Sequence, residues 1–493
     1  MNAAQRLLSQ GDDAATALVC GQRLVSYREL REAVARAGGL LRARGVQPGD
    51  RVVVLGADSV AWVVAWLGGL WAGAVSLGLN PRTQPDELAD ILLESRARLC
   101  LADPDAASSL ATSTLQMPLH VLDLDAVEAL PSQPIALHPR EPGEVAFWLY
   151  SSGTTGRPKA IVHRHSCVEG CAAFARDVLG VTARDRLYAT SKLFFAYPLA
   201  NSLFAGLFLG ASVVLDPRWP EPARVAEVAD AHRPTILFSV PTLFHRMLDA
   251  GVAQTIARAG VRRYVSAGEG LPKAVAQRWR EATGASILGG YGMTETLALV
   301  LYADPLNDPG GRPAPLASVR ADPPADAAAP QRLWFRHPSL ALGYHDRGEL
   351  QRRAFRDGWC SSGDLFYPND DGSWRFAGRE DALLKVAGRW VDAQAVNANI
   401  AYGMGALLED STVLGIAGAE GLTGLALYAV AARDVESAAR ARLAEVASRL
   451  PVHQQPRWVY WLDALPRTPT GKLSSAGLRE HHVRALTQPK PSA

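Results

Sequence analysis

Residues 145–159 read VAFWLYSSGTTGRPK, an apolar run followed by a loop rich in glycine and hydroxyl side chains. The run VAFWLY predicts a buried strand. Glycines let backbone N–H groups converge on an anion, and hydroxyl groups add further donors. The loop residues concerned are Ser151, Ser152, Gly153, Thr154, Thr155 and Gly156. Lys159 can reach a phosphate, but it follows Pro158, so the loop differs from a Walker A motif. The stretch therefore predicts a strand that ends in a phosphate-binding loop.

Helices and short apolar strands alternate on both sides of this stretch. The expected helices cover residues 25–45, 59–72, 86–96 and 224–233, and the expected strands cover 51–56, 74–79, 97–102 and 235–240. This alternation predicts an α/β fold with parallel strand pairing. Residues 303–330 are rich in Pro, Ala, Asp and Gly and are expected to form an exposed linking segment.

The length and the change of pattern near residue 380 indicate two domains of unequal size. A chain of 493 residues corresponds to about three domain-sized units, or to one large domain and a small one. After residue 380 the chain has strands at 411–418, 425–432 and 458–463 and one charged helix at 436–449. We therefore expect a large N-terminal domain, residues 1–380, and a small C-terminal α+β domain, residues 381–493.

Composition excludes several classes of protein. The hydrophobic fraction of 48% is that of a globular protein, not of a disordered one. A net charge of +2 gives no electrostatic reason to expect nucleic acid. The five cysteines are odd in number and irregularly spaced, which favours a reducing, cytoplasmic location. The uncharged run at 59–81 has the length of a membrane span, but its glycines and strand-like end favour a buried helix and a strand. We expect no membrane partner.

His163, His165, Cys167 and Cys171 lie close together in the sequence, as metal ligands do. No second ligand pair follows at zinc-type spacing, and Cys167 and Cys171 are one helical turn apart. A buried helix face is therefore favoured over a metal site.

The loop at 151–159 resembles that of the adenylate-forming enzymes, which comprise acyl- and aryl-CoA ligases, carrier-loading adenylation domains and firefly-type luciferases. The resemblance extends from about residue 25 to about residue 480. It is strongest to benzoate-type CoA ligases, in FWLYSSGTTGRPK (147–159) and KLFFAYPLANSL (192–203). It implies a large N-terminal domain of mixed sheets and helices, a small mobile C-terminal domain, and an active site between them.

The turn YGMTET, residues 291–296, brings an aromatic ring, a hydroxyl and a carboxylate together after an apolar run. The resemblance implies that Tyr291 stacks on adenine, that Thr294 contacts phosphate and that Glu295 contacts Mg²⁺. Mg²⁺ takes one or two carboxylates together with substrate phosphates. The backbone near Gly268 and Glu269, in SAGEGLPK (266–273), is expected to line the adenine.

Asp364 lies at the end of a glycine-containing turn, SSGDLF (361–366). A carboxylate there can accept hydrogen bonds from both ribose hydroxyls, although an ordinary turn aspartate would look the same. The resemblance pairs it with Arg379 as a second ribose or phosphate contact. It also implies a hinge at Asp381 and a CoA-side surface at Lys385 and Gly388.

Lys472 follows two prolines, a threonine and a glycine in PRTPTGKL (466–473), a composition typical of a rigid turn. Only six of the 51 basic residues are lysines, so lysine positions point to places where a compact ammonium is needed. The resemblance implies that Lys472 bridges the substrate carboxylate and the α-phosphate during adenylation, while Lys159 contacts the other phosphates.

The acyl pocket is expected near the segment KLFFAYPLA and a pair of glycines. A flat slot for an aromatic ring would be formed by Phe195, Ala196, Tyr197, Gly289 and Gly290. Core packing of these aromatic side chains is the alternative.

The sequence departs from the family pattern at a few places. Ala160 replaces the usual glycine after the loop lysine. Beyond Gly388, Ala395 and Asn397 stand where two acidic residues are expected, and Asp392 is unusual. These three lie in or beside the surface used for thioester formation, so they weaken that assignment.

The leading hypothesis is an AMP-forming aryl-CoA ligase that uses ATP, Mg²⁺ and CoA on a benzoate-type, hydroxybenzoate-type or aminobenzoate-type acid. The first alternative is an adenylation enzyme that loads an aryl acid onto a carrier protein. The second is a weakly catalytic acyl-adenylate-binding protein. A homodimer is left open.

Overall fold

The computed structural model describes residues 1–111, 120–124, 127, 133–151, 158–322, 329–380, 383–387, 389–417, 423–432, 434–466 and 473–487. The chain divides into two compact units. The first comprises Met1–Arg320, Trp334–Ser362 and Asn369–Trp374, and the second comprises Ala321–Leu333, Gly363–Pro368 and Arg375–Ala493.

The strand predicted before the glycine-rich loop is β7, and it lies inside a mixed sheet of the first unit. In the described part of the chain this sheet has seven strands in the order β18-β8-β7-β4-β3-β5-β6. Neighbours among β7, β4, β3, β5 and β6 pair in parallel, whereas β8 is antiparallel to β7 and β18 to β8. The bounds are β3 (Arg51–Leu55), β4 (Val75–Leu79), β5 (Leu99–Ala102), β6 (His120–Asp123), β7 (Val145–Ser151), β8 (Lys159–Arg164) and β18 (Gly343–Tyr344).

A second sheet of the same unit has nine strands among the described residues, in the order β15-β14-β13-β12-β11-β9-β10-β1-β2. Its bounds are β1 (Thr16–Cys20), β2 (Arg23–Ser26), β9 (Arg186–Ala189), β10 (Ser212–Leu215), β11 (Ile236–Ser239), β12 (Arg263–Ser266), β13 (Ile287–Tyr291), β14 (Leu301–Ala303) and β15 (Arg312–Pro313). Neighbouring strands β9, β11, β12 and β13 are parallel. The α/β class with parallel pairing is therefore confirmed.

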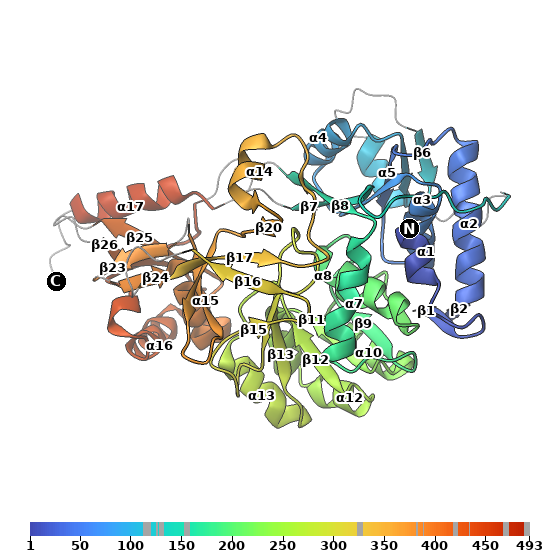
Figure 1. Ribbon diagram of the computed structural model, residues 1–493. Helices are drawn as coiled ribbons and strands as arrows, with labels where there is room; N and C mark the ends of the chain where they lie inside the picture. Colours follow the sequence, from blue (N-terminus) through green and yellow to red (C-terminus); the bar gives the residue numbers. More distant parts are fainter. Residues whose placement is uncertain are drawn as a thin grey trace. The chain divides into compact units, whose positions relative to one another are not determined.

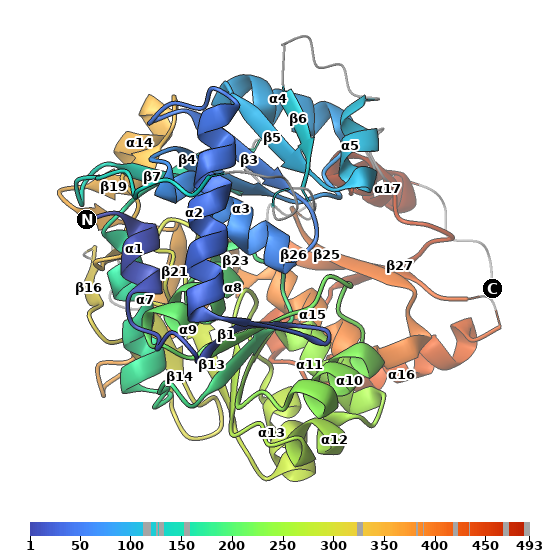
Figure 2. The same ribbon diagram turned by 90° about the vertical axis from the view of Figure 1, so that its right-hand side faces the viewer.

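Helices surround these two sheets. Figure 2 shows α2 and α3 side by side next to β3, and Figure 1 shows α12 and α13 beside β12 and β13. The bounds are α1 (Ala3–Leu8), α2 (Tyr27–Ala43), α3 (Val60–Trp71), α4 (Pro85–Ser95), α5 (Pro104–Ala111), α7 (Cys167–Asp177), α8 (Ala196–Pro198), η1 (Leu199–Phe204), α9 (Ala205–Phe208), α10 (Pro222–His232), α11 (Pro241–Asp249), α12 (Ala253–Arg258), α13 (Lys273–Thr283) and α14 (Gly348–Ala354).

Local sequence signals explain where the first helices begin. Ser26 and Glu29 form a reciprocal capping box at the start of α2, and Ser59 caps α3. Helix α3 is buried along nearly its whole length, and Trp66 packs against Phe147 of β7. This apolar helix is 12 residues long. No helix in the described ranges is long and apolar enough to cross a membrane.

The prediction of a buried helix face at Cys167 and Cys171 is confirmed, because both side chains are buried on α7. All five cysteines are free. Within the residues that the structure describes, no group of three or more His, Cys, Asp or Glu side chains is placed to hold a metal ion.

The second unit has its own strands, helices and apolar core. Strands β25 and β26 are antiparallel, and β27 is parallel to β26. The prediction of a single helix after residue 380 was incomplete, because α15 and α17 accompany α16. The bounds are β21 (Asp364–Pro368), β23 (Leu383–Val386), β24 (Arg389–Asp392), α15 (Ala393–Met404), η2 (Gly405–Leu407), β25 (Asp410–Ala417), β26 (Thr423–Val430), α16 (Glu436–Ser448), η3 (Val452–Gln454), β27 (Trp458–Trp461) and α17 (Ser475–Thr487).

The chain passes between the units within a few short strands. These are β16 (Ser318–Ala321), β17 (Gln331–Arg336) and β22 (Trp374–Arg379). Strands β19 (Phe355–Arg356) and β20 (Trp359–Cys360) belong to the same sheet and lie within the first unit. Phe335 pairs with Cys360 in the first unit, and Arg332 pairs with Leu365 in the second. The expected linking segment at 303–330 therefore includes the ordered strands β15 and β16, which pair with β14 and β17.

Candidate active site

Lys159 and Glu295 are predicted from separate motifs, and the structure brings them together in the first unit. The Lys159 Nζ donates a hydrogen bond to Glu295 Oε1 at 2.7 Å. The Tyr344 hydroxyl donates to the same oxygen at 2.6 Å, and Lys159 Nζ lies 3.2 Å from that hydroxyl. Tyr344 arrives through β18, where it pairs with Ile161 of β8. The three side chains form one polar cluster, in which Glu295 is buried and Lys159 and Tyr344 are partly buried.

Sequence reasoning missed Tyr344, which is 185 residues from Lys159. The sequence GYHD around it carries no spacing signal that links it to the glycine-rich loop. Only the antiparallel pairing of β18 with β8 places the ring near the lysine. Its face also lies 4.6 Å from Lys159 Nζ, measured to the ring centroid, a cation–π contact.

The cluster keeps Glu295 ionised. The residue is only 6% exposed, and burial by itself would raise the pKa of the carboxyl group. The ammonium of Lys159 and the hydrogen bonds from Lys159 and Tyr344 outweigh burial and hold the pKa of Glu295 below its ordinary value. Burial and the nearby carboxylate raise the pKa of Tyr344, so its hydroxyl stays a proton donor.

An ionised carboxylate in this position fits a magnesium ion that is shared with substrate phosphates. Both hydrogen bonds that Glu295 receives from other side chains end on Oε1. One or two carboxylates suffice for Mg²⁺ when phosphate oxygens supply further ligands. Glu295 would be the protein ligand of such an ion.

The turn after β13 holds Glu295 in place through the neighbouring Thr296. The Thr296 hydroxyl lies 3.1 Å from the Met293 carbonyl and 3.0 Å from the Ala298 carbonyl. Ser339 Oγ donates to the Thr296 carbonyl at 2.6 Å. Thr294, the predicted phosphate contact, is only partly buried on the same turn. Thr296 is fully buried and holds the turn through these hydrogen bonds. The sequence alone did not show this role, because it does not tell which of the two threonines of the turn is buried.

His163 lies on β8 within this region as a buried neutral ring. It stacks on Phe147, with ring centroids 4.9 Å apart. Neither ring nitrogen has a hydrogen-bond partner among the described residues. Burial lowers the pKa of His163 to about 3, although Glu295 and the Thr294 backbone act in the opposite direction. The histidine is therefore uncharged at neutral pH.

The residues predicted for the adenine lie at the ends of two neighbouring strands. Ser266 at the end of β12 pairs with Gly289 of β13, so Gly268, Glu269 and Tyr291 emerge at the same edge. Gly268 has φ +89°, a conformation that favours glycine.

Side-chain contacts hold this edge in place. Glu269 Oε2 accepts a hydrogen bond from the Thr242 hydroxyl at 2.7 Å. The Tyr291 hydroxyl donates to Ser362 Oγ at 2.7 Å, and the Tyr291 ring centroid lies 5.7 Å from that of Phe335.

The segment predicted for the acyl pocket reaches the same strands. Tyr197 donates a hydrogen bond to the Val265 carbonyl of β12 at 3.0 Å. Ala196 is partly buried, and Phe195 is 49% exposed, which excludes core packing for that ring. The two glycines of β13 differ sharply in the room beside them.

A Cβ atom at Gly290 would lie 2.5 Å from the Leu299 side chain. A Cβ atom at Gly289 would have Ala303 O at 3.7 Å as its nearest neighbour, an ordinary contact. The open space is therefore beside Gly289. A larger side chain at Gly290 would instead collide with Leu299.

In the second unit Asp364 and Arg379, the two residues expected at the ribose, lie near each other. Arg379 Nη1 is 3.8 Å from Asp364 Oδ1, and Asp364 is 9% exposed. Lys385 of β23 lies opposite Trp390 of β24, with Nζ 5.7 Å from the ring centroid. The unusual Asp392 caps α15, accepting hydrogen bonds from the backbone of Gln394 at 2.8 Å and of Ala395 at 3.2 Å.

Several predicted site residues lie outside the described residues. They are Ser152, Gly153, Thr154, Thr155, Gly156, Asp381, Gly388 and Lys472. Ser151 is described as the last residue of β7, opposite Lys159 of β8.

Comparison with known proteins agrees with this arrangement. A family model described as AMP-binding enzyme matches residues 8–345. The chain is 37% identical to the 3-hydroxybenzoate–CoA ligase of Aromatoleum sp. (strain CIB), with 97% of each chain covered. It is 33% identical to the benzoate–CoA ligase of Thauera aromatica, covering 92% of this chain and 90% of that one.

A crystal structure of a benzoate CoA ligase from Burkholderia xenovorans LB400 is similar in fold as well. It superimposes with a TM-score of 0.82 at 29% identity, covering 97% of this chain and 100% of that one. The family model spans more than half of the chain and the 3-hydroxybenzoate–CoA ligase matches along almost its full length. The chain therefore belongs to the AMP-binding enzyme family.

Proposed function

We propose that this protein is an AMP-forming aryl-CoA ligase. It would use ATP and Mg²⁺ to convert a benzoate-type, hydroxybenzoate-type or aminobenzoate-type acid into an aryl-adenylate, and then transfer the aroyl group to the thiol of CoA with release of AMP. The observation that carries this proposal is the cluster in which Lys159 and Tyr344 both donate hydrogen bonds to the buried Glu295. The similarity to ligases named for hydroxybenzoate and benzoate supports the choice of acid.

The first half-reaction joins two anions. A carboxylate oxygen of the acid attacks the α-phosphorus of ATP, the bond to the β-phosphate oxygen breaks, and pyrophosphate leaves. Because little covalent chemistry is asked of the protein, positioning and neutralisation of negative charge supply most of the rate. Lys159 places a positive charge at the end of the loop. Magnesium bound at Glu295 would withdraw charge from the phosphates.

Lys472 and the C-terminal domain complete this proposal. Lys472 would bridge the acid and the α-phosphate during adenylation, with Asp364 and Arg379 on the ribose. The thiol of CoA must then reach the acyl carbon, so residues 381–493 would move about a hinge at Asp381 and bring Lys385 and Gly388 toward CoA. Domain rotation of this kind lets one site serve two reactions.

Transfer of the aroyl group to the thiol of a carrier protein is the second candidate. Its support is the absence of the expected acidic pair at Ala395 and Asn397. In the structure Asn397 donates a hydrogen bond to the Ser411 carbonyl at 3.1 Å, so it has a role in the fold of the second unit. A weakly catalytic binding protein is disfavoured, since binding alone does not require Lys159, Glu295 and Lys472 together.

Pyrophosphate release, measured over a panel of aromatic and aliphatic acids with and without CoA, tests the proposal. We expect release that depends on an aromatic acid, and an aryl-CoA product when CoA is present. Adenylation without any CoA thioester would favour the carrier protein, and a preference for octanoate over benzoate would contradict the aromatic substrate.

Two further predictions concern location and assembly. The five free cysteines support a cytoplasmic location, which cell fractionation would test. A homodimer stays a prediction that sedimentation measurements would test.

A further inference from the structure

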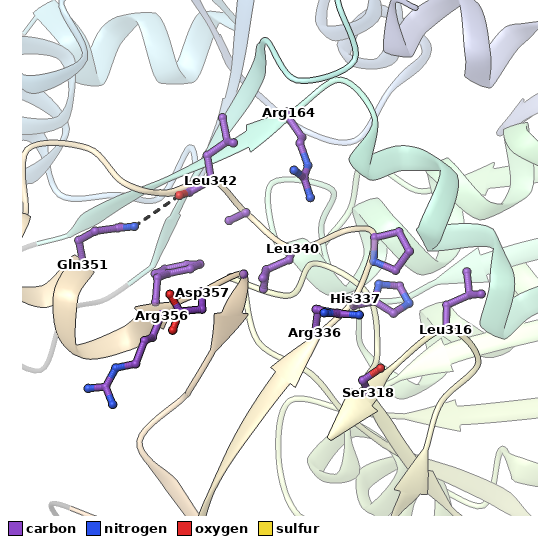
Figure 3. Close-up of a pocket in the computed structure, with 14 residues that line it drawn as sticks. Arg164, Leu316, Ser318, Arg336, His337, Leu340, Leu342, Gln351, Arg356 and Asp357 are labelled. Carbon is purple, nitrogen blue, oxygen red and sulfur yellow. Dashed lines mark hydrogen bonds between the residues drawn. The ribbon is translucent and has the colours of Figure 1, made fainter. Parts of the chain in front are cut away.

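A cavity of about 700 Å³ opens in the first unit (Figure 3). None of the described residues that line it is among those assigned above to ATP, acid or CoA. It lies between the end of β8, the segment that joins β17 to β18, and the β19–β20 turn. Among the described residues, those that line it include Arg164, Arg336, His337, Leu340, Gln351 and Arg356. We call it the Arg164 cavity.

The walls of the Arg164 cavity carry an excess of positive charge. Three arginines line it, and Asp357 is its one acidic residue in the described part of the chain. His337 is buried, and burial lowers its pKa to about 4, so the ring is neutral at neutral pH. Arg336 lies over Trp359 and Arg356 over Trp334, at 5.5 and 5.2 Å from the ring centroids. Contact with an aromatic ring does not neutralise a guanidinium group, so both arginines keep their positive charge.

Arg164 is partly buried and is paired with no carboxylate within the described residues; Arg51 and Arg186 also lack a carboxylate partner, but they donate to backbone carbonyls instead. The Nε of Arg164 is buried and has no hydrogen-bond partner within the described residues. By contrast, the partly buried Arg224 pairs with Asp216 at 2.9 Å. Figure 3 shows Arg164 reaching from β8 toward Leu340 and His337. Arg164 as a whole is only partly buried, but a buried donor without a hydrogen-bond partner costs free energy, so an anion in the cavity would supply a partner for its Nε.

We propose that the Arg164 cavity binds a phosphate group, either free or carried by a small organic molecule. Guanidinium groups match phosphate oxygens with two parallel hydrogen bonds, and the Ser318 hydroxyl on the rim can add a donor. The volume is within the range of small-molecule sites. Leucine side chains on the wall, Leu316 and Leu342 among them, offer an apolar surface to an organic group.

The wall of the cavity is hydrogen-bonded to the backbone of a residue in the candidate active site. Ala341, on the cavity wall, donates its backbone N–H to the Glu295 carbonyl at 2.8 Å. A ligand against Leu340 and Ala341 would therefore touch the segment that bonds directly to the Glu295 backbone.

The proposal is tested by calorimetric titration of the full chain at constant ionic strength. One titration uses inorganic phosphate, and a separate one uses phenyl phosphate. Arg164→Gln should weaken binding by about tenfold or more, the usual effect of losing hydrogen bonds to a charged group. Arg164→Lys should recover part of it. The matched control is Arg184→Gln, at an exposed arginine of the same unit, and it should bind as the wild type does. Tighter binding of phenyl phosphate would support an organic ligand, and equal binding would support free phosphate.

Equal phosphate affinity in the wild type and Arg164→Gln would overturn the proposal. So would a stability gain in Arg164→Gln with no phosphate effect on the wild type, because Arg164 would then be only an unpaired charge. If Arg164→Gln does not fold, Arg336→Gln is measured in its place, with the same expected loss. No acid or ATP is present, so the result does not depend on the proposed ligase activity.

Discussion

Replacing the buried His163 with leucine should make the protein less sensitive to acid. The ring has a pKa of about 3 in the folded protein, compared with about 6.5 when unfolded. Between these values the unfolded chain binds a proton that the folded chain does not, so stability falls as the pH falls. The contribution is fully present above pH 6.5. At pH 5 the unfolded ring is 1.5 pH units below its pKa, and at about 1.36 kcal/mol per unit the loss is about 2 kcal/mol.

Urea unfolding at pH 8 and pH 5 measures this loss. Fluorescence of buried tryptophans such as Trp62 and Trp66 reports on the first unit. We expect His163→Leu to lose about 2 kcal/mol less than the wild type between the two pH values. His453→Gln, at a partly exposed position in the second unit, is the control and should behave as the wild type. If His163→Leu loses as much stability as the wild type, the histidine is not held neutral by burial, and the reasoning fails.

Three further changes test the candidate active site. Lys159→Met should abolish pyrophosphate release and cost about 3–5 kcal/mol of stability, because it leaves Glu295 buried without its partner; the double variant Lys159→Met/Glu295→Gln should recover part of that stability in urea unfolding, and no recovery would argue against the ion pair. Gly289→Val should lower kcat/KM for benzoate-like acids at least tenfold, about 1.4 kcal/mol, with an unchanged KM for ATP, whereas Gly290→Ala should mainly lower Tm; the reverse pattern would move the acyl pocket to the other face of β13. Lys472→Ala should nearly abolish adenylation and spare the reaction of preformed aryl-adenylate with CoA, and an equal loss in both half-reactions would contradict its role.

Elements with strong local patterns were predictable from the sequence. The helix expected at 59–72 is α3, and the strand expected at 51–56 is β3. Both follow from apolar runs bounded by capping or turn residues, which are local signals. The short strands β15 and β16 were missed because their residues carry little apolar pattern. Their strand form depends on pairing with β14 and β17.

The sequence by itself determined the α/β class, the glycine-rich loop and the separate motifs that contain Lys159 and Glu295, because each depends on residues that are neighbours in the chain. Only the tertiary structure decided that Tyr344 joins this pair. Tyr344 is 185 residues from Lys159 in the sequence, and the register of β18 on β8 places it near the lysine. The tertiary structure also decided which of the adjacent glycines has room beside it. Successive residues of a strand face opposite sides of the sheet, and what lies on each side comes from distant parts of the chain. The sequence likewise shows the charge of Arg164, but only the fold leaves its Nε without a hydrogen-bond partner among the described residues.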